Sequence, residues 1–162
     1  MIPVPEPKLD HLYQEVILDH NKSPRNYKAL SDANVSSHGY NPLCGDDYHV
    51  YLKIDPKGLV HDIGFQGSGC AISKSSASIM TTLVKGKSLN ETAALSDQFL
   101  RLITSEISEQ PDEERLGKLA VFAGVREFPA RIKCASLGWH ALKAAVQGEK
   151  KPVSTEEPSG KK

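Results

Sequence analysis

Excess charge is the first thing this sequence lacks. Its 162 residues carry 20 basic and 20 acidic side chains, so the formal net charge is zero. A protein without excess positive charge lacks the electrostatic attraction that provides most of the non-specific affinity for nucleic acids. We therefore expect neither DNA nor RNA as its main partner.

Long apolar segments are also missing. The first ten residues contain three prolines and two acidic residues, which is unlike the apolar core of a signal peptide. No stretch approaches the roughly 20 apolar residues that cross a bilayer. We expect a cytoplasmic protein that does not act at a membrane.

Cysteine is scarce, and its number is odd. The chain has three cysteines, so they cannot all form disulfides within one molecule. A reducing cytosol keeps such residues as thiols. This pattern favours metal binding or nucleophilic chemistry over a disulfide framework.

The hydrophobic pattern predicts an α+β fold. Apolar residues at three- and four-residue steps indicate helices, and strict alternation indicates strands with one buried face. We predict strands over 33–38, 48–54 and 59–65. We predict helices over 9–20, 71–84, 88–103 and 111–122, and a last helix that starts near Cys134. The expected fold is a small antiparallel β-sheet packed on one face by several α-helices.

The composition changes near residue 148. Residues 1–147 contain all the predicted elements and are expected to form a single domain. Residues 148–162 are rich in Glu, Lys, Pro, Ser and Thr and have no face that could pack. We expect this segment to be a disordered C-terminal tail.

The three cysteines and one aspartate form a candidate metal site. Cys44 and Asp46 lie two positions apart on a predicted turn, whereas Cys70 and Cys134 are each expected where a helix begins. A helix N-terminus stabilises a thiolate, which is the form that binds zinc. Three thiolates and one carboxylate complete a tetrahedral zinc site. On these residues alone, scattered buried cysteines are an equally good interpretation.

Other ligands are open to consideration. Asp47 could replace Asp46, because the two are adjacent in the sequence. His49, His61 and His140 are isolated histidines, and such residues are more often packed or solvated than bound to a metal.

Three motifs carry a resemblance to a known family: PLCGD at 42–46, GSGCAIS at 67–73 and FPARIKC at 128–134. The chain resembles the U-type iron–sulfur cluster assembly proteins (IscU/NifU N-terminal-like) over roughly residues 9–147. Within that family it looks like the SufU branch, because Lys133 stands where IscU-type proteins carry a histidine. A SufU-like insertion is expected at about 103–122.

The resemblance implies a function and a cofactor. A zinc-dependent sulfurtransferase of this branch accepts persulfide sulfur from a SufS-type cysteine desulfurase and relays it to downstream iron–sulfur assembly proteins. By position in the motifs, the catalytic acceptor is Cys44. The implied zinc ligands are Cys44, Asp46, Cys70 and Cys134.

Two basic residues stand close to the last cysteine in the sequence. Lys133 is protonated at neutral pH, since the reference pKa of lysine is about 10.4, and so it has no lone pair for a metal. We expect Arg131 and Lys133 to tune the charge of the site instead. An alternative function with the same ligands is a scaffold that assembles and transfers a transient 2Fe-2S cluster. A weaker one is a purely structural zinc domain.

Overall fold

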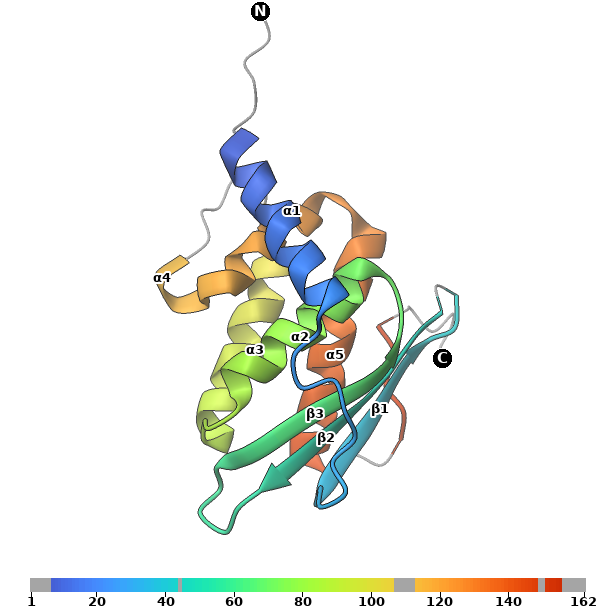
Figure 1. The fold of residues 1–162 in the computed structure, drawn as a ribbon, viewed down its shortest axis with the longest axis vertical. Coiled ribbons are helices and arrows are strands. Elements are labelled where there is room, and N and C mark those ends of the chain that lie inside the picture. Colours follow the sequence, from blue (N-terminus) through green and yellow to red (C-terminus); the bar gives the residue numbers. More distant parts are fainter. Residues whose placement is uncertain (1–6, 44, 107–112, 149–150, 156–162) are drawn as a thin grey trace, which may run out of the picture.

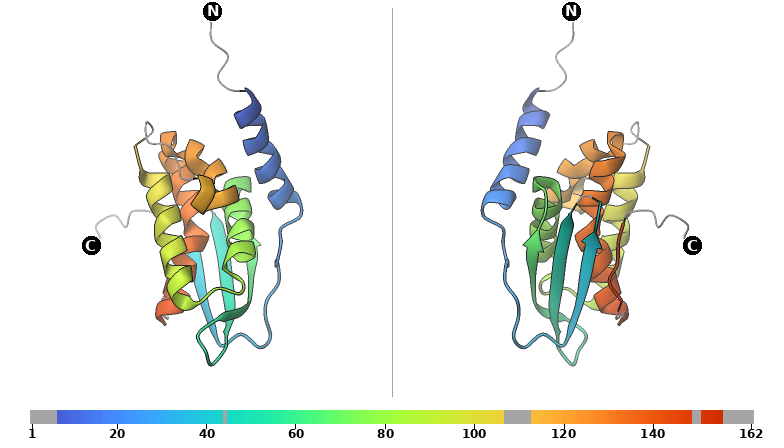
Figure 2. Two further views of the ribbon diagram at one scale, coloured as in Figure 1. Left: turned by 90° about the vertical axis from the view of Figure 1, so that its left-hand side faces the viewer. Right: turned by 90° about the vertical axis from the view of Figure 1, so that its right-hand side faces the viewer.

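A three-stranded antiparallel sheet forms one layer of the protein, and helices cover one of its faces (Figures 1 and 2). The computed structural model describes residues 7–43, 45–106, 113–148 and 151–155. The strands, in sheet order, are β1 (Val35–Asn41), β2 (Asp46–Ile54) and β3 (Val60–Ser68). The helices are α1 (Pro7–Lys22), α2 (Ala71–Val84), α3 (Leu89–Thr104), α4 (Glu113–Leu116), the 3-10 helix η1 (Gly117–Glu127) and α5 (Pro129–Gln147). The predicted α+β class is confirmed.

Strand β2 follows the alternation seen in the sequence. Tyr48, Val50 and Leu52 are fully buried, whereas His49 between them is exposed. A turn at 55–58 then reverses the chain into β3, with hydrogen bonds from two backbone N–H groups to one carboxylate oxygen of its aspartate. The predicted hairpin is therefore present.

Strand β1 ends later than predicted. The sequence placed the strand at 33–38 and a loop after it, but the ladder continues to Asn41, which pairs with Asp46. The fully buried Asn41 side chain accepts a hydrogen bond from the backbone N–H of Thr155 at 2.9 Å and donates one to its Oγ1 at 2.8 Å. These distant partners stabilise the additional strand residues.

Part of the C-terminal segment lies along the edge of β1. The sequence predicted disorder from residue 148, yet residues 151–155 lie beside the strand in the structure. The backbone N–H of Tyr40 donates to Val153 O, and the N–H of Val153 donates to His38 O, both at 2.9 Å. Backbone groups of an edge strand need such partners, and this segment supplies them.

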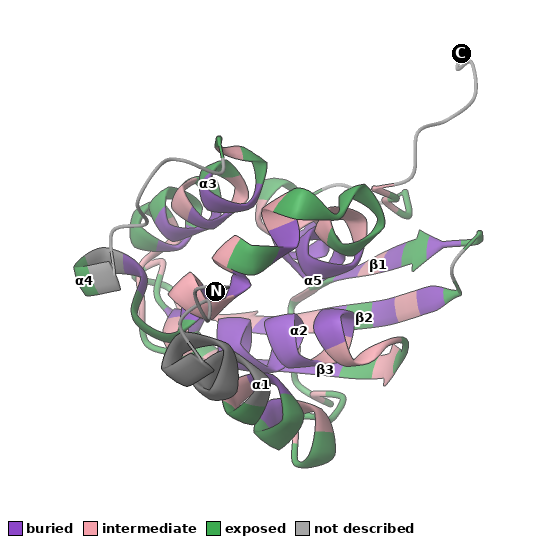
Figure 3. Cartoon of the chain, turned by 90° about the horizontal axis from the view of Figure 1, so that it is seen from above, coloured by how far each residue is buried: buried purple, intermediate pink, exposed green. Residues whose placement is uncertain are grey.

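Helices α2 and α5 pack closely against each other over the sheet. A Cβ added to Gly138 would lie 3.2 Å from the Cβ of Ala77, so the glycine permits the close approach. The indole N–H of the buried Trp139 donates to Ser76 Oγ at 3.1 Å, and that hydroxyl donates to Ala135 O at 2.7 Å. Figure 3 shows α2 buried along most of its length.

The remaining helices form an outer layer. The ring of Phe99 in α3 lies between those of Phe122 in η1 and Trp139 in α5, at centroid distances of 5.7 and 4.8 Å. The segment predicted as an insertion, about 103–122, includes the end of α3, α4 and part of η1, while 107–112 lie outside the described residues. None of the helices in the described ranges has the length and apolar character needed to span a membrane.

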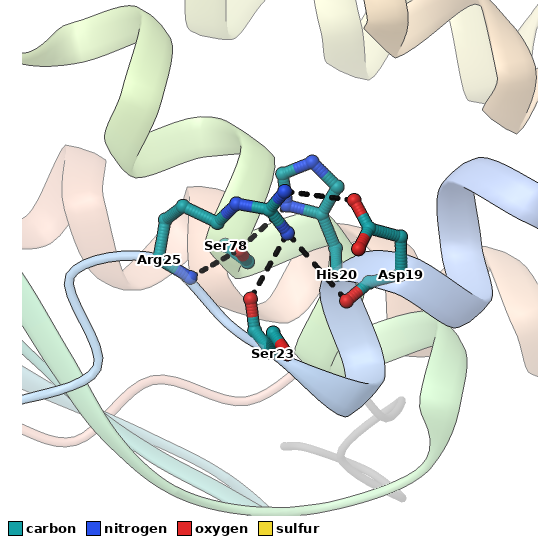
Figure 4. A network of polar contacts seen from close by, with 5 residues as sticks. All are labelled: Asp19, His20, Ser23, Arg25 and Ser78. Carbon is teal, nitrogen blue, oxygen red and sulfur yellow. Dashed lines mark hydrogen bonds and ion pairs between the residues drawn. The ribbon is translucent and has the colours of Figure 1, made fainter.

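A polar network attaches the end of α1 to α2 (Figure 4). Nδ1 of the buried His20 lies 2.7 Å from Ser78 Oγ, which also accepts a hydrogen bond from the Arg25 backbone N–H at 2.8 Å. The Arg25 guanidinium pairs with Asp19 at 2.7 Å. Burial is the main cause that lowers the pKa of His20 from 6.5 to about 4.

The lowered pKa of His20 predicts a loss of stability in acid. The folded protein holds this imidazole neutral. Its contribution to the free energy of unfolding is therefore complete above pH 6.5 and is lost as the pH falls through about 4. A shift of this size corresponds to at most about 3 kcal/mol. Urea unfolding of His20→Gln at a series of pH values should give a curve that falls less steeply between these limits than that of the wild type.

The exposed His61 supplies the matched control, because His61→Gln removes an imidazole that is not buried. An equally steep acid loss in His20→Gln and in the wild type would contradict the assignment.

Candidate metal centre

Three of the four sequence-predicted ligands converge at one end of the sheet. Asp46 begins β2, Cys70 immediately precedes α2, and Cys134 lies in α5. One carboxylate oxygen and the two sulfur atoms all lie within 4.8 Å of one another. Asp46 is 1% exposed and Cys134 is 7% exposed, whereas Cys70 is partly buried. The fold thus brings together residues that are far apart in the sequence.

The Asp46 carboxylate is only partly satisfied by the protein. Its Oδ1 accepts a hydrogen bond from the Cys70 backbone N–H at 3.1 Å. Its Oδ2 is buried and makes no hydrogen bond to another described residue. A buried charged oxygen without a partner is costly. A cation bound between this oxygen and the two sulfur atoms would remove that cost, so the donor set fits a metal such as zinc.

The start of α2 prepares Cys70 as a thiolate. Cys70 is the N-cap residue, and its Sγ accepts a hydrogen bond from the Ser73 backbone N–H at 3.4 Å. The hydrogen bond with the Cys134 thiol, together with those from Ser73, lowers the pKa of Cys70 to about 6. In the chain alone, Cys70 therefore ionises first. The same hydrogen bond with Cys70, together with burial, raises the pKa of Cys134.

Cys134 is not at a helix start, which corrects the prediction from the sequence. Helix α5 begins at Pro129, so Cys134 lies in its second turn. Proline suits the first helical position, because the N–H that it lacks would have no helical partner there. The helix N-terminus therefore favours a thiolate at Cys70 only. Packing of α5 on α2, not capping, brings Cys134 to the centre.

The fourth predicted ligand and proposed acceptor, Cys44, lies outside the described residues. The neighbouring Leu43 and Gly45 belong to the turn between β1 and β2, and Leu43 is 89% exposed. Asp47, the alternative to Asp46, lies on the opposite face of β2 together with His49, because consecutive strand residues point to opposite sides.

The two basic residues occupy different environments. Arg131 is exposed, one helical turn before Cys134. Lys133 is partly buried and lines a groove of about 680 Å³ between α3, α5 and the C-terminal segment, together with His140 and Thr155. Their influence on the charge of the centre stays a prediction.

A second layer of residues around the donors was not predicted from the sequence. The buried Tyr48 hydroxyl lies 3.0 Å from Ser73 Oγ, which donates a hydrogen bond to Cys70 O at 3.0 Å. Burial raises the pKa of Tyr48, so its hydroxyl remains protonated. Two signals in the sequence point to these residues: Ser73 follows Cys70 by the three positions typical of N-capping, and Tyr48 shares a strand face with Asp46.

Gly69 provides the space in which the donors meet. A Cβ at this position would lie 2.5 Å from Asp46 Oδ1, 2.6 Å from Ser73 Oγ and 2.7 Å from Tyr48 Oη. Real Cβ atoms essentially never approach other atoms so closely. Only glycine therefore leaves these three oxygen atoms where the structure has them.

Fold and site together define a class: α+β proteins in which a sheet end and two helices hold a centre of two thiols and one carboxylate. Comparison with known families identifies the family to which this class corresponds. Residues 12–152 match the model of the NifU-like N terminal domain. The chain belongs to this family, and the resemblance found in its motifs is confirmed.

Two named relatives and one solved structure are similar to this chain over most of its length. The zinc-dependent sulfurtransferase SufU of Bacillus subtilis is 43% identical over 141 residues, which cover 87% of this chain and 93% of SufU. The iron-sulfur cluster assembly scaffold protein IscU of Streptococcus pyogenes is 41% identical over 140 residues, or 86% of each chain. A crystal structure of a scaffold protein for the SUF system from Fervidobacterium islandicum, 29% identical, superposes with a TM-score of 0.75 over 84% of this chain and 97% of that one.

Filling the space at Gly69 should disturb the centre directly. In Gly69→Ala, the added methyl group displaces the oxygen atoms of Asp46, Ser73 and Tyr48, which we expect to cost about 1 to 3 kcal/mol of stability. The metal content of the purified protein should fall as well. Thermal unfolding and elemental analysis measure the two effects.

Gly58→Ala is the matched control. Gly58 has a φ of +83°, so alanine there is strained, but no atom lies within 4 Å of the added Cβ. This variant should lose about 1 kcal/mol and keep its metal. Equal metal content in both variants would contradict the role assigned to Gly69.

Proposed function

We propose that this protein is a zinc-dependent sulfurtransferase of iron–sulfur cluster assembly. It accepts sulfur on Cys44 from a SufS-type cysteine desulfurase and passes the sulfur to downstream assembly proteins. The observation that carries the proposal is the convergence of Asp46, Cys70 and Cys134 in a buried donor set with an unpartnered carboxylate oxygen. The similarity to a zinc-dependent sulfurtransferase supports it.

The residues that would hold zinc are Cys44, Asp46, Cys70 and Cys134. When bound, zinc keeps its cysteine ligands as thiolates and adds its binding free energy to that of folding. The protein contributes the arrangement: Cys70 N–H orients the carboxylate, and the hydrogen bonds at the start of α2 favour a thiolate at Cys70. The reducing cytoplasm, where we place the protein, keeps these thiols available.

The position of Cys44 in the family motif, together with the burial of Cys134, supports Cys44 as the sulfur acceptor. Cys134 is 7% exposed, so a desulfurase cannot reach its sulfur without opening the fold. In the sequence Cys44 stands between Leu43, which is 89% exposed, and Gly45, which is also exposed. A Cys44 thiolate attacks the outer sulfur of the desulfurase persulfide. The new S–S bond forms on Cys44, the old one breaks, and the desulfurase cysteine leaves as a thiolate, without net oxidation.

With a metal ion bound, the proposed centre would carry a net negative charge, which favours basic side chains near it. Three thiolates, one carboxylate and one divalent metal ion sum to a formal charge of −2. Arg131 is exposed in the first turn of α5. Lys133 lines the groove between α3, α5 and the C-terminal segment. In the proposed function both lower the cost of the negative charge and attract an anionic persulfide.

A scaffold for a transient 2Fe-2S cluster is the second candidate. It is supported by the IscU relative, whose identity to this chain is nearly as high as that of SufU. Thiolates and carboxylates bind iron as well as zinc. The two candidates differ in the metal that the protein retains and in its effect on the desulfurase.

The sulfurtransferase predicts loss of sulfur acceptance in Cys44→Ser. This variant keeps Asp46, Cys70 and Cys134, but it lacks the thiolate that forms the new S–S bond. We expect the rate of alanine release by a SufS-type desulfurase, and the transfer of labelled sulfur, to fall by about two orders of magnitude. Asp97→Asn, on the exposed face of α3, is the control and should behave as the wild type.

Metal analysis of the aerobically purified protein separates the alternatives. About one tightly bound zinc ion per chain, with strong stimulation of the desulfurase, supports sulfur transfer. Iron and sulfide without stimulation support the scaffold. If Cys44→Ser accepts sulfur at the wild-type rate, Cys44 is not the acceptor.

A further inference from the structure

A second group of potential metal ligands lies on the face of the sheet that the described helices leave uncovered (Figure 2). It consists of His38 on β1 and of Asp47 and His49 on β2. The side chain of His38 is 31% exposed, that of Asp47 is 43% exposed, and His49 is exposed. The function proposed above uses none of these residues.

The register of the two strands brings the three side chains together. His38 and His49 are direct cross-strand partners, and Asp47 precedes His49 by two positions on the same face. The two imidazole rings are parallel within 2°, with centroids 4.2 Å apart. Nε2 of His38 lies 2.7 Å from Asp47 Oδ1. One ligand atom from each residue falls within a common span of 4.8 Å.

We propose that His38, Asp47 and His49 form a second metal site, which binds a late first-row divalent ion such as Zn²⁺. Two imidazole nitrogens and one carboxylate oxygen are a donor set that these ions favour, and solvent can fill the remaining positions. Ligands at about 2.0 to 2.2 Å from one ion lie at most about 4.4 Å apart. For both lone pairs to point at one ion, the imidazoles must rotate out of their parallel stack, and the partial exposure of His38 and Asp47 and the exposure of His49 leave room for this. The nitrogen of His38 that binds the ion carries no proton, so the neutral ring keeps its one proton on the other nitrogen.

Two tyrosines lie beside the histidine pair on the same strands. Tyr40 lies two positions after His38 on β1, and Tyr51 two positions after His49 on β2, with near-parallel rings whose centroids are 6.1 and 6.3 Å from those of the histidines. The face of the sheet around the histidine pair is therefore aromatic. Partial burial, followed by the neighbouring His38, lowers the pKa of His49 from its ordinary value.

The two metal sites are separated by the sheet itself. Asp46 and Asp47 are adjacent, and strand alternation directs them to opposite faces. Asp46 meets the two thiols in the interior, while Asp47 meets the two histidines outside. The donor sets also differ, because only the interior site contains sulfur. Occupancy of one site is therefore measurable without the other.

Zinc binding to protein without an affinity tag tests the proposal. The purified chain, with its resident metal, is dialysed against free Zn²⁺ at increasing concentrations up to about 1 mM, and bound zinc is counted per chain. The wild type should bind one additional zinc ion. The imidazole ¹⁵N resonances of His38 and His49 should shift with the same midpoint. His38→Asn and His49→Asn should each weaken this binding by about tenfold or more, since each removes one ligand.

His61→Asn is the matched control, because His61 is an exposed histidine on β3 outside the cluster. It should bind the additional zinc like the wild type. Circular dichroism confirms that each variant is folded, and His49, which is exposed, offers the safer substitution. No additional zinc on the wild type, or additional zinc that His49→Asn retains at unchanged affinity, would overturn the proposal. Neither result depends on the metal held by Asp46 and the cysteines.

Discussion

The close contact between α2 and α5 is the constraint on which the metal centre depends. Gly138 and Ala77 allow the two helices to approach, and Ser76 joins them through hydrogen bonds to Trp139 and Ala135. Cys70 lies at the beginning of one helix and Cys134 in the second turn of the other. A wider spacing between the helices would separate the two thiols, whatever the geometry of the neighbouring loops. The small side chains of α2 thus have a structural role that extends to the site.

The sheet supplies the third donor and sets which side it faces. Asp46 begins β2, and its pairing with the buried Asn41 positions it at the end of the ladder. The buried carboxylate oxygen of Asp46 that has no hydrogen-bond partner is unfavourable without a cation, because it lacks water as well. Stability and metal binding are therefore coupled at this end of the molecule. The opposite face of the same strand carries an exposed donor set of different chemistry.

Much of the fold could be predicted from the sequence, since its signals are local. The alternation of Tyr48, Val50 and Leu52 with polar residues identified β2. The capping box formed by Ser88 and Glu91 identified the start of α3, and both of its hydrogen bonds are present. Such patterns depend on neighbouring residues, so they are readable without the rest of the chain. The start of the helix that contains Cys134 was predicted several residues after its true start at Pro129. A proline at the first position and a preceding 3-10 segment give only weak periodic signals.

Long-range contacts account for what the sequence did not predict. The end of β1 and the C-terminal segment stabilise each other through Asn41 and Thr155, which are distant in the sequence. No local pattern reveals such a pairing, and the polar composition of residues 148–162 suggested disorder. The same reasoning applies to Tyr48 and Ser73, whose contact beside Cys70 joins a strand to a helix.

The sequence by itself determined the types of element, the α+β class and the residues with metal-binding chemistry, because these follow from side-chain type and spacing. Its motifs also determined the family. The motifs implied Asp46 as the ligand, but only the tertiary structure shows that its carboxylate lies beside Cys70 and Cys134, and that Asp47 meets two histidines. Which side chains share a site depends on strand register and helix packing. Both are set by contacts between residues far apart in the chain.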